Sequence, residues 1–193
     1  MTIAILGQGN MGKGLAKRLA GKTDVVLALR SGGVSYADAV KGAEIVVLAI
    51  PFNAALEEAG KLDLAGKIVI DISNPVTADF SGLTIGHTTS AAEEIAKVAK
   101  GARVVKAFNT IFASLFDTPA SATANVPVFV AGDDDAAVAA VAELAAKAGF
   151  AVEKVGGLDG ARLVEPVGML NIRLGYGLGK GTSIAPNWLK LAA

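Results

Sequence analysis

Apolar residues occur along this chain in short, nearly continuous runs that alternate with stretches of helical spacing. Continuous apolar runs of five to seven residues are typical of parallel strands that are buried on both faces. The pattern therefore predicts an α/β fold with a doubly wound, mostly parallel sheet. The expected strands cover residues 2–6, 24–29, 44–50, 67–72, 103–108, 126–131 and 151–155, and the clearest expected helices follow residue 9 and cover 36–40, 90–100, 136–148 and 159–178.

The first apolar run leads directly into a glycine-rich turn, Gly7-Gln8-Gly9-Asn10-Met11-Gly12. Gly7 lets the chain reverse, Gly9 leaves room for a pyrophosphate, and Gly12 lets the next helix pack against the strand. The N–H groups at the start of that helix would face the phosphates. The motif is weak alone, but its place between a strand and an amphipathic helix predicts a dinucleotide site in a Rossmann-type fold. The alternative is a tight turn without a ligand.

The end of the second strand distinguishes between the two nicotinamide dinucleotides. Arg30-Ser31 follows this strand, and no carboxylate stands there. An acidic residue would bind the ribose hydroxyls of NAD, whereas arginine accommodates the 2′-phosphate of NADP. We therefore expect NADP as the cofactor, with an arginine that is merely solvent-exposed as the alternative.

Three further strand ends are expected to face the ligand, because the carboxyl ends of the strands line the crevice of a doubly wound sheet. Ser73 and Asn74 could hydrogen-bond the nicotinamide ribose or carboxamide, although Ser-Asn-Pro is also ordinary turn chemistry. We interpret Asn53 as a helix cap rather than a ligand. The expected cofactor-binding residues at these ends are Ala49, Ile50, Pro51, Ser73, Asn74, Pro75, Ala107, Phe108 and Asn109.

Composition and charge exclude several other classes of function. The chain has 193 residues, 18 basic and 18 acidic side chains and no cysteine. The balanced charge favours neither nucleic acid nor a membrane as partner, and thiol catalysis is excluded. His87 is the single histidine, and we interpret it as structural rather than as an acid or base. We expect no metal site, because Asp133-Asp134-Asp135 stands where it would cap the helix that follows.

The chain is expected to form a single domain over residues 1–193, with the helix and glycine-rich tail of residues 159–193 packed on it. The helical spacing of Leu163, Val167, Leu170 and Leu174 predicts this helix, and the tail around residues 175–181 is too rich in glycine to continue it. Trp188 would anchor a homodimer interface or enter the core. Because no leader pattern and no apolar run of ~18–20 residues is present, we expect a cytoplasmic protein.

Several motifs together resemble those of one family. They are the glycine turn at 7–12, Leu29-Arg30, Asp71-Ile72-Ser73-Asn74-Pro75, the run 104–109 and Gly132-Asp133. The chain is similar to the NADP oxidoreductases that reduce the deazaflavin coenzyme F420, and to the NADPH-oxidising domains of the STEAP metalloreductases. The similarity extends from residue 2 to about residue 178 and includes the stretch 162–165.

This resemblance implies a Rossmann domain that holds NADPH in an extended pose. Residues 8–11 would bind the pyrophosphate and Arg30 the 2′-phosphate, while the ends of the third, fourth and fifth strands would surround the nicotinamide and the acceptor ring. The motifs at 73–75 and 106–109 look closer to the metalloreductase domains, which pass hydride to a flavin. Deazaflavin, FMN and FAD therefore all stay open as the small-molecule acceptor.

Hydride transfer between a nicotinamide and a flavin-like ring needs the two rings stacked ~3–3.5 Å apart and no acid or nucleophile from the protein. A chain without cysteine and with one histidine meets that demand. A first alternative is a reductase of small imines or carbonyl compounds, in which His87 or Tyr176 would donate the proton. A second is a sensor that binds NADPH without turnover.

Overall fold

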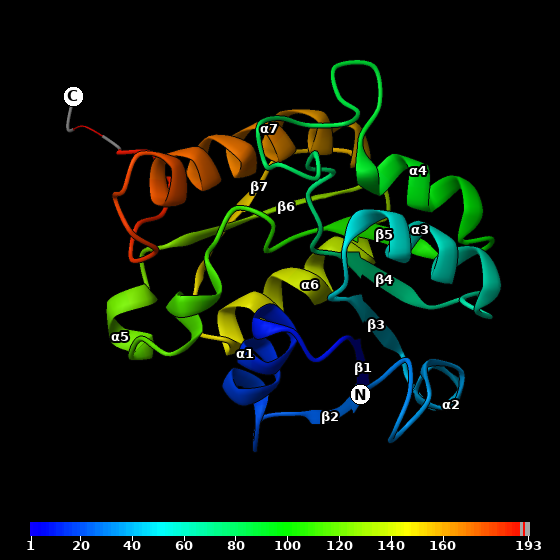
Figure 1. The fold of residues 1–193 in the computed structure, drawn as a ribbon. Coiled ribbons are helices and arrows are strands. Elements are labelled where there is room, and N and C mark those ends of the chain that lie inside the picture. The colour runs from blue at the N-terminus through cyan, green and yellow to red at the C-terminus, as the bar shows by residue number, and fades with distance from the viewer. Residues whose placement is uncertain (190, 192–193) are drawn as a thin grey trace.

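The computed structural model describes residues 1–189 and 191, and within them seven strands form one sheet in the order β2-β1-β3-β4-β5-β6-β7. Figure 1 shows this sheet between helices. Strands β1 to β5 run parallel, β6 is antiparallel to β5, and β7 is parallel to β6. The predicted α/β Rossmann-type fold is thus confirmed. The strands are β1 (Thr2–Leu6), β2 (Asp24–Ala28), β3 (Ile45–Leu48), β4 (Ile68–Asp71), β5 (Arg103–Lys106), β6 (Pro127–Gly132) and β7 (Ala151–Lys154).

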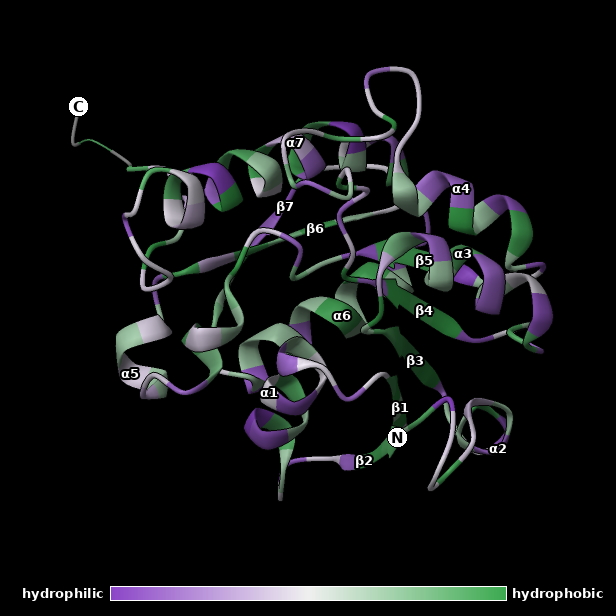
Figure 2. Ribbon diagram, in the orientation of Figure 1, coloured by the Kyte–Doolittle hydropathy of each residue, from purple (hydrophilic) through white to green (hydrophobic). Residues whose placement is uncertain are grey.

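Helices bury both faces of the sheet. In β1, Ile3 and Ile5 belong to the core on one face, whereas Ala4 and Leu6 belong to the core on the other. Burial on both sides explains why the central strands read as continuous apolar runs, and Figure 2 shows β1, β3 and β4 in the green of hydrophobic residues. α1 (Asn10–Leu19) and α6 (Asp135–Lys147) cover the first face, while α2 (Tyr36–Lys41), α3 (Phe52–Lys61) and α4 (Ala91–Val98) cover the second.

The remaining helices are short or lie at the carboxyl end of the chain. Residues 111–125 form the irregular segment expected there, with a 3₁₀ turn η1 (Ala113–Phe116) and the short α5 (Ala120–Thr123). A second 3₁₀ turn, η2 (Leu158–Gly160), leads into α7 (Ala161–Ile172), which continues as one π-helical turn, η3 (Arg173–Gly177). The predicted helical region of residues 159–178 is therefore confirmed as far as residue 177, whereas the prediction that the glycine-rich stretch from residue 175 cannot be helical was wrong for residues 175–177.

Two predicted helix starts are confirmed by their caps. Ser90 Oγ accepts a hydrogen bond from the Glu93 backbone N–H at 3.2 Å, as an N-cap does, and its hydroxyl donates to the Glu93 carboxylate at 2.7 Å. Asp134 caps α6 by accepting from the Ala137 N–H at 2.7 Å. Its neighbour Asp133 accepts from the Leu158 N–H at 2.8 Å. Local side-chain chemistry thus explains both of these aspartates without a metal.

One prediction from a single residue was wrong. Asn53 does not cap α3, because the helix already begins at Phe52 after Pro51. The proline itself supplies the fixed φ that helix entry needs. Another proline, Pro127, lies in β6 between β5 and β7. It is tolerated because it is the first residue of its strand, where a missing N–H costs little.

The apolar spacing of the last helix predicted the helix but not its buried face. Leu163 and Leu170 are 70% and 55% exposed, whereas Glu165, Gly168 and Asn171 are buried. The buried face packs on loops that follow β4 and β5, where small and polar residues fit better than leucine.

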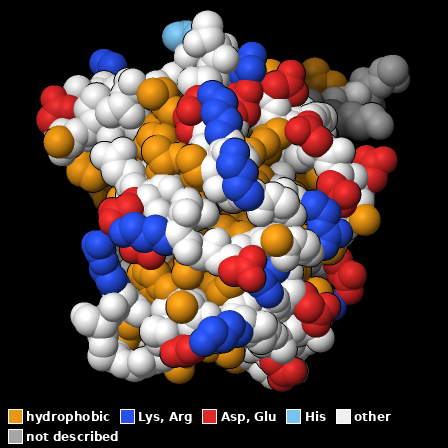
Figure 3. All heavy atoms as spheres, turned by 90° about the vertical axis from the view of Figure 1, so that its right-hand side faces the viewer, with side chains coloured by type: hydrophobic (Ala, Val, Ile, Leu, Met, Phe, Trp, Pro, Cys, Tyr) orange, Lys and Arg blue, Asp and Glu red, His pale blue; other side chains and the backbone are white. Residues whose placement is uncertain are grey.

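The surface carries both signs of charge. Figure 3 shows acidic and basic side chains interspersed over the face that carries α2, α3 and α4. No helix of residues 1–189 has both the length and the apolar character that a membrane crossing needs. Trp188 does not enter the core, because it is 69% exposed; its ring forms a T-shaped pair with the Phe129 ring, with centroids 5.5 Å apart.

Candidate functional site

The turn between β1 and α1 lies where the strand order of the sheet reverses. Gly7 has φ 115°, and a Cβ on it would lie 2.4 Å from the Ala49 carbonyl oxygen at the end of β3. A Cβ on Gly12 would lie 2.1 Å from the Gly7 carbonyl oxygen. Gly9 has nothing within 4 Å of its would-be Cβ. Two glycines therefore allow close packing, and the third leaves open space at the topological switch point, where ligands bind in such folds.

The amino end of α1 has no internal partner for its first N–H groups. The cap residue Gly9 offers no side-chain oxygen, and the first turn of α1 contains no acidic residue. The N–H groups of Asn10, Met11 and Gly12 precede the first intrahelical bonds and carry the positive end of the helix dipole. The turn thus fits an anionic group such as a pyrophosphate.

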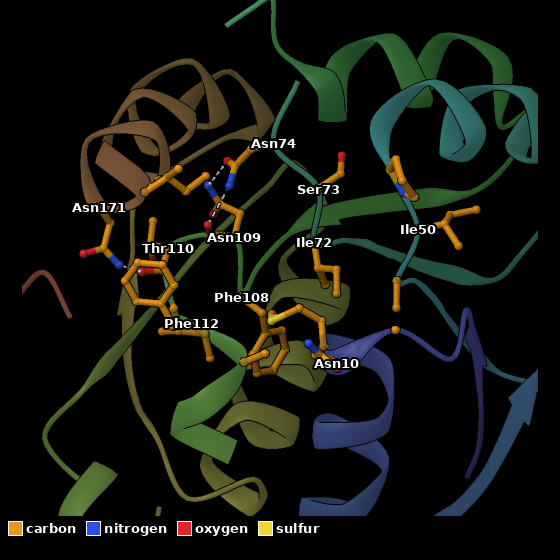
Figure 4. Close-up of a pocket in the computed structure, with 18 of the residues that line it drawn as sticks. Asn10, Ile50, Ile72, Ser73, Asn74, Phe108, Asn109, Thr110, Phe112 and Asn171 are labelled. Atoms are coloured by element: carbon orange, nitrogen blue, oxygen red, sulfur yellow. Dashed lines mark hydrogen bonds between the residues drawn. The ribbon is translucent and has the colours of Figure 1, made fainter. Parts of the chain in front are cut away.

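A cleft of about 370 Å³ opens beside this turn, at the carboxyl ends of the parallel strands (Figure 4). It brings together most of the residues predicted from the sequence, including all three residues after β3. The predicted residues that line it are Gly9, Asn10, Met11, Ala49, Ile50, Pro51, Ser73, Asn74, Phe108 and Asn109. Gly7, Gln8, Gly12, Pro75 and Ala107 belong to the same turns but do not line the cleft, and Arg30 and Ser31 lie beyond the end of β2.

Part of the cleft was not predicted from the sequence. One wall follows β5 directly and another belongs to α7 and its final π turn. The sequence signals for the second wall were the glycine and asparagine within the helix and Tyr176, which the alternative of an imine or carbonyl reductase names as a proton donor. The lining residues that were not predicted are Ile72, Thr110, Ile111, Phe112, Ala113, Gly168, Asn171 and Ile172, and Tyr176 lines the cleft with them.

Three asparagines tie the walls of the cleft to one another, as Figure 4 shows. Asn74 Nδ2 donates to the Asn109 carbonyl at 2.8 Å, and Asn109 Nδ2 donates to Asn74 Oδ1 at 2.9 Å. Asn109 Nδ2 also donates to the Val164 carbonyl of α7 at 3.0 Å. Asn171 of α7 donates to the Thr110 carbonyl at 3.0 Å. The amides therefore join the loops after β4 and β5 to α7.

Three buried polar atoms of the described residues have no hydrogen-bond partner, and all three belong to the lining of the cleft. They are Ser73 Oγ, Asn109 Oδ1 and Thr110 Oγ1. Buried polar atoms are normally paired, so such a group calls for an explanation. Phe108 directly precedes Asn109 and lines the same cleft. It is a buried residue with φ 61°, a conformation that costs roughly 1–3 kcal/mol in residues other than glycine. Both features are typical of a site that a polar ligand completes.

Behind the cleft lies a cluster of three buried charges. Lys106 Nζ lies 2.6 Å from Asp71 Oδ2 and 2.8 Å from Glu165 Oε1, and it donates to the Ser73 carbonyl at 2.6 Å. Glu165 also accepts from the Ala91 N–H at the start of α4. Burial raises the pKa of Glu165, and the ammonium of Lys106 opposes that rise.

Two predicted candidates lie outside the cleft. Arg30 is 68% exposed, and its guanidinium lies 3.8 Å from Glu57 and 3.9 Å from Glu58 of α3. Exposed pairs at such distances hold a side chain weakly, so Arg30 keeps access to another anion. His87 is exposed on the loop before α4, where it lies beside Pro166 and Met169 rather than in the cleft. The structure does not bring it together with the other candidates.

The comparisons with known proteins agree with this geometry. The family model described as "NADP oxidoreductase coenzyme F420-dependent" matches residues 29–75. An F420-dependent NADP reductase of Methanothermobacter marburgensis is 32% identical, over 90% of this chain and 92% of its own length. This chain belongs to the F420-dependent NADP oxidoreductase family.

Other relatives extend the comparison. A crystal structure assigned as an F420-dependent NADP reductase of Arthrobacter sp. FB24 has a TM-score of 0.84 at 30% identity, and covers 97% of this chain and 99% of its own. The metalloreductase STEAP3 of Rattus norvegicus is 32% identical over 86% of this chain, but the match spans only 36% of that protein. The predicted family is confirmed, and the chain is homologous to enzymes. Nothing in these matches supports FMN or FAD as the acceptor.

Proposed function

We propose that this protein transfers hydride between NADP(H) and the deazaflavin coenzyme F420. The proposal rests on one observation above all. A single cleft runs from the unpaired N–H groups of α1 to the unpartnered polar atoms of Ser73, Asn109 and Thr110. A dinucleotide needs an anion site at its centre and polar contacts around its reactive ring, and this cleft offers them in that order.

The residues at the adenosine end have a separate role in the proposal. The N–H groups at the start of α1 would hold the pyrophosphate, and Arg30 with Ser31 would hold the 2′-phosphate of NADP. For this, Arg30 exchanges its distant carboxylate neighbours on α3 for a phosphate in direct contact. An arginine–phosphate contact is a charge-assisted hydrogen bond, which is stronger than the exposed pairs it replaces.

The reaction itself needs little chemistry from the side chains. A bound nicotinamide would supply a hydride, a hydrogen with its electron pair, to the acceptor ring, and the accompanying proton would come from solvent. Ile50, Ile72 and Phe108 would form the apolar surface against which the rings stack. Tyr176 is the one titratable side chain among the described lining residues. A cleft of this composition suits positioning of the two rings rather than acid–base catalysis.

The test is anaerobic mixing of the purified protein with NADPH or NADH and with F420, FMN or FAD in turn. We expect loss of the visible deazaflavin absorbance with NADPH, a much slower loss with NADH, and no reaction of FMN or FAD above background. Reduction of FMN or FAD in preference to F420 would replace the acceptor in this proposal. Tight NADPH binding without reduction of any acceptor would instead favour a sensor.

Tyr176 also keeps a second candidate open, the reduction of a small imine or carbonyl compound. Its ring packs edge-on against Phe112 at the rim of the cleft, with centroids 5.4 Å apart, and its hydroxyl would be the proton donor of that reaction. Tyr176→Phe should leave deazaflavin reduction unchanged. A rate that falls in this variant for an imine substrate would favour the second candidate.

A further inference from the structure

Lys106 is a fully buried charge. It is the last residue of β5, its side chain is 0% exposed, and its ammonium has three partners. Two are the carboxylates of Asp71 and Glu165, and the third is the Ser73 carbonyl oxygen. These partners come from the end of β4, from α7 and from the loop that follows β4. The ammonium group of β5 thus joins the end of β4 and the loop after it to α7, which is far away in the sequence.

Two of these segments form adjoining walls of the cleft. Ser73 lines the cleft. Its carbonyl oxygen accepts a hydrogen bond from Lys106, whereas the Ser73 hydroxyl has no partner. Glu165 precedes Gly168 by one helical turn, so both lie on the same face of α7. A Cβ on Gly168 would lie 2.7 Å from Asn74 Oδ1 and 2.9 Å from the Asn109 carbonyl oxygen. The helix is therefore pressed against the Asn74–Asn109 pair at the point where Lys106 anchors it.

Stability alone does not explain three charges in this place. Removing charges from water costs about as much as their mutual attraction returns, so an apolar trio of similar size would be at least as stable. The helices that Glu165 connects are also joined at the surface, where Arg162 of α7 donates to the Glu93 carboxylate of α4 at 2.9 Å. The buried cluster instead fixes the relative positions of the loop after β4 and of α7, because the ammonium requires each partner at a fixed distance and angle.

We propose that Lys106 is a positioning residue that sets the spacing between the Ser73-Asn74 wall and the α7 wall, and thereby orients the nicotinamide ring in the cleft. This inference rests on the proposed function only in taking a nicotinamide dinucleotide as the ligand. The lysine does not touch the ligand. It acts through the Ser73 carbonyl and through Glu165.

The test compares two ligands that differ only in the nicotinamide. NADPH and 2′-phospho-ADP-ribose share the adenosine, the 2′-phosphate and the pyrophosphate, so the ratio of their dissociation constants reports how well the nicotinamide is held. The first variant is Lys106→Met. The second is the triple variant Asp71→Asn, Lys106→Met, Glu165→Gln, which leaves no unpaired carboxylate and keeps the fold testable if the single variant does not fold. The matched control is Arg162→Met, which removes the other link between α4 and α7 without touching the cleft.

We expect 2′-phospho-ADP-ribose to bind both cluster variants within about 3-fold of the wild type, since its groups lie at the other end of the cleft. The advantage of NADPH over this ligand should fall about 10-fold, and the single-turnover rate of hydride transfer at saturating NADPH by about 10- to 100-fold, as misplacement by an ångström predicts. Arg162→Met should lower the melting temperature and leave both quantities unchanged.

The inference fails if the cluster variants keep the wild-type ratio, or if Arg162→Met changes the ratio and the rate as much as they do. In the latter case the cluster serves stability only. If both cluster variants fail to fold, Glu165→Gln alone decides, because it keeps the Lys106–Asp71 pair and weakens only the link to α7. A wild-type protein that binds NADPH but reduces no acceptor would refute the proposed function, while the ratio of affinities would still test Lys106.

Discussion

Gly168 gives the sharpest test of how α7 forms the cleft. It lies in the interior of α7, and alanine there would place a methyl group 2.7 Å and 2.8 Å from the two amide atoms of Asn74 and 2.9 Å from the Asn109 carbonyl oxygen. These distances are far below van der Waals contact, and the nearest atoms belong to the amide pair and a backbone carbonyl. Either α7 moves away or the Asn74–Asn109 hydrogen bonds break.

The magnitude follows from two opposing effects. Alanine in place of glycine stabilises a helix interior by about 0.5–1 kcal/mol. Overpacking of a close contact costs about 1–3 kcal/mol. We therefore expect Gly168→Ala to lower the free energy of unfolding by about 0–2.5 kcal/mol, the difference of these ranges. Nicotinamide-dependent activity should fall as well, because Asn74 lines the cleft.

A second glycine supplies the matched control. Gly60 lies in the last turn of α3, and the nearest atom to its would-be Cβ is the Val98 Cβ at 3.8 Å, an ordinary contact. Gly60→Ala should therefore leave the stability unchanged or raise it by up to about 1 kcal/mol, with full activity. Urea unfolding of both variants measures the two free energies. The reasoning is refuted if Gly168→Ala proves as stable and as active as Gly60→Ala.

Three further predictions concern separate parts of the chain. Arg30→Ala should weaken NADPH binding by about 1.5–3 kcal/mol, or about 10- to 150-fold, and leave NADH nearly unchanged; equal loss for both cofactors in titrations would exclude the 2′-phosphate contact. Asp134→Ala should lower the free energy of unfolding by about 0.5–2 kcal/mol through loss of the α6 cap, and a smaller loss than in Asp135→Ala would contradict that role. Hydrogen bonds from Thr77 and Ser81 lower the pKa of Asp79 from 3.8 to about 2, so this carboxylate stabilises the loop above pH 3.8 and the contribution is lost as the pH falls through about 2. A carboxyl NMR titration should find that midpoint, and Thr77→Val should raise it; a midpoint already near 3.8 in the wild type would contradict the contacts.

Much of the fold could be predicted from local patterns, since parallel strands buried on both faces need apolar residues at every position. The glycine turn was predictable for a related reason. Gly7 and Gly12 stand where a side chain would collide with a backbone oxygen, and such a constraint leaves glycine in the sequence itself. The caps at Ser90 and Asp134 are equally local, because each joins residues three apart.

The wall of the cleft that α7 forms could not be predicted in this way. Its residues on α7 meet the loops after β4 and β5 only when the chain is folded, and their spacing within the helix carries no sign of those distant partners. The apolar periodicity of α7 even pointed to Leu163 and Leu170, which are exposed, because the helix packs on amides and carbonyls rather than on an apolar core.

The sequence by itself thus determined the succession of strands and helices along the chain, the glycine turn and the polar strand ends. These features depend on neighbours along the chain. Only the tertiary structure decided that Lys106 holds Asp71, Ser73 and Glu165 together, and that α7 closes the cleft over Asn74 and Asn109. The physical reason is that a hydrogen bond or an ion pair between distant segments depends on distance and direction in space, which residue types alone do not encode.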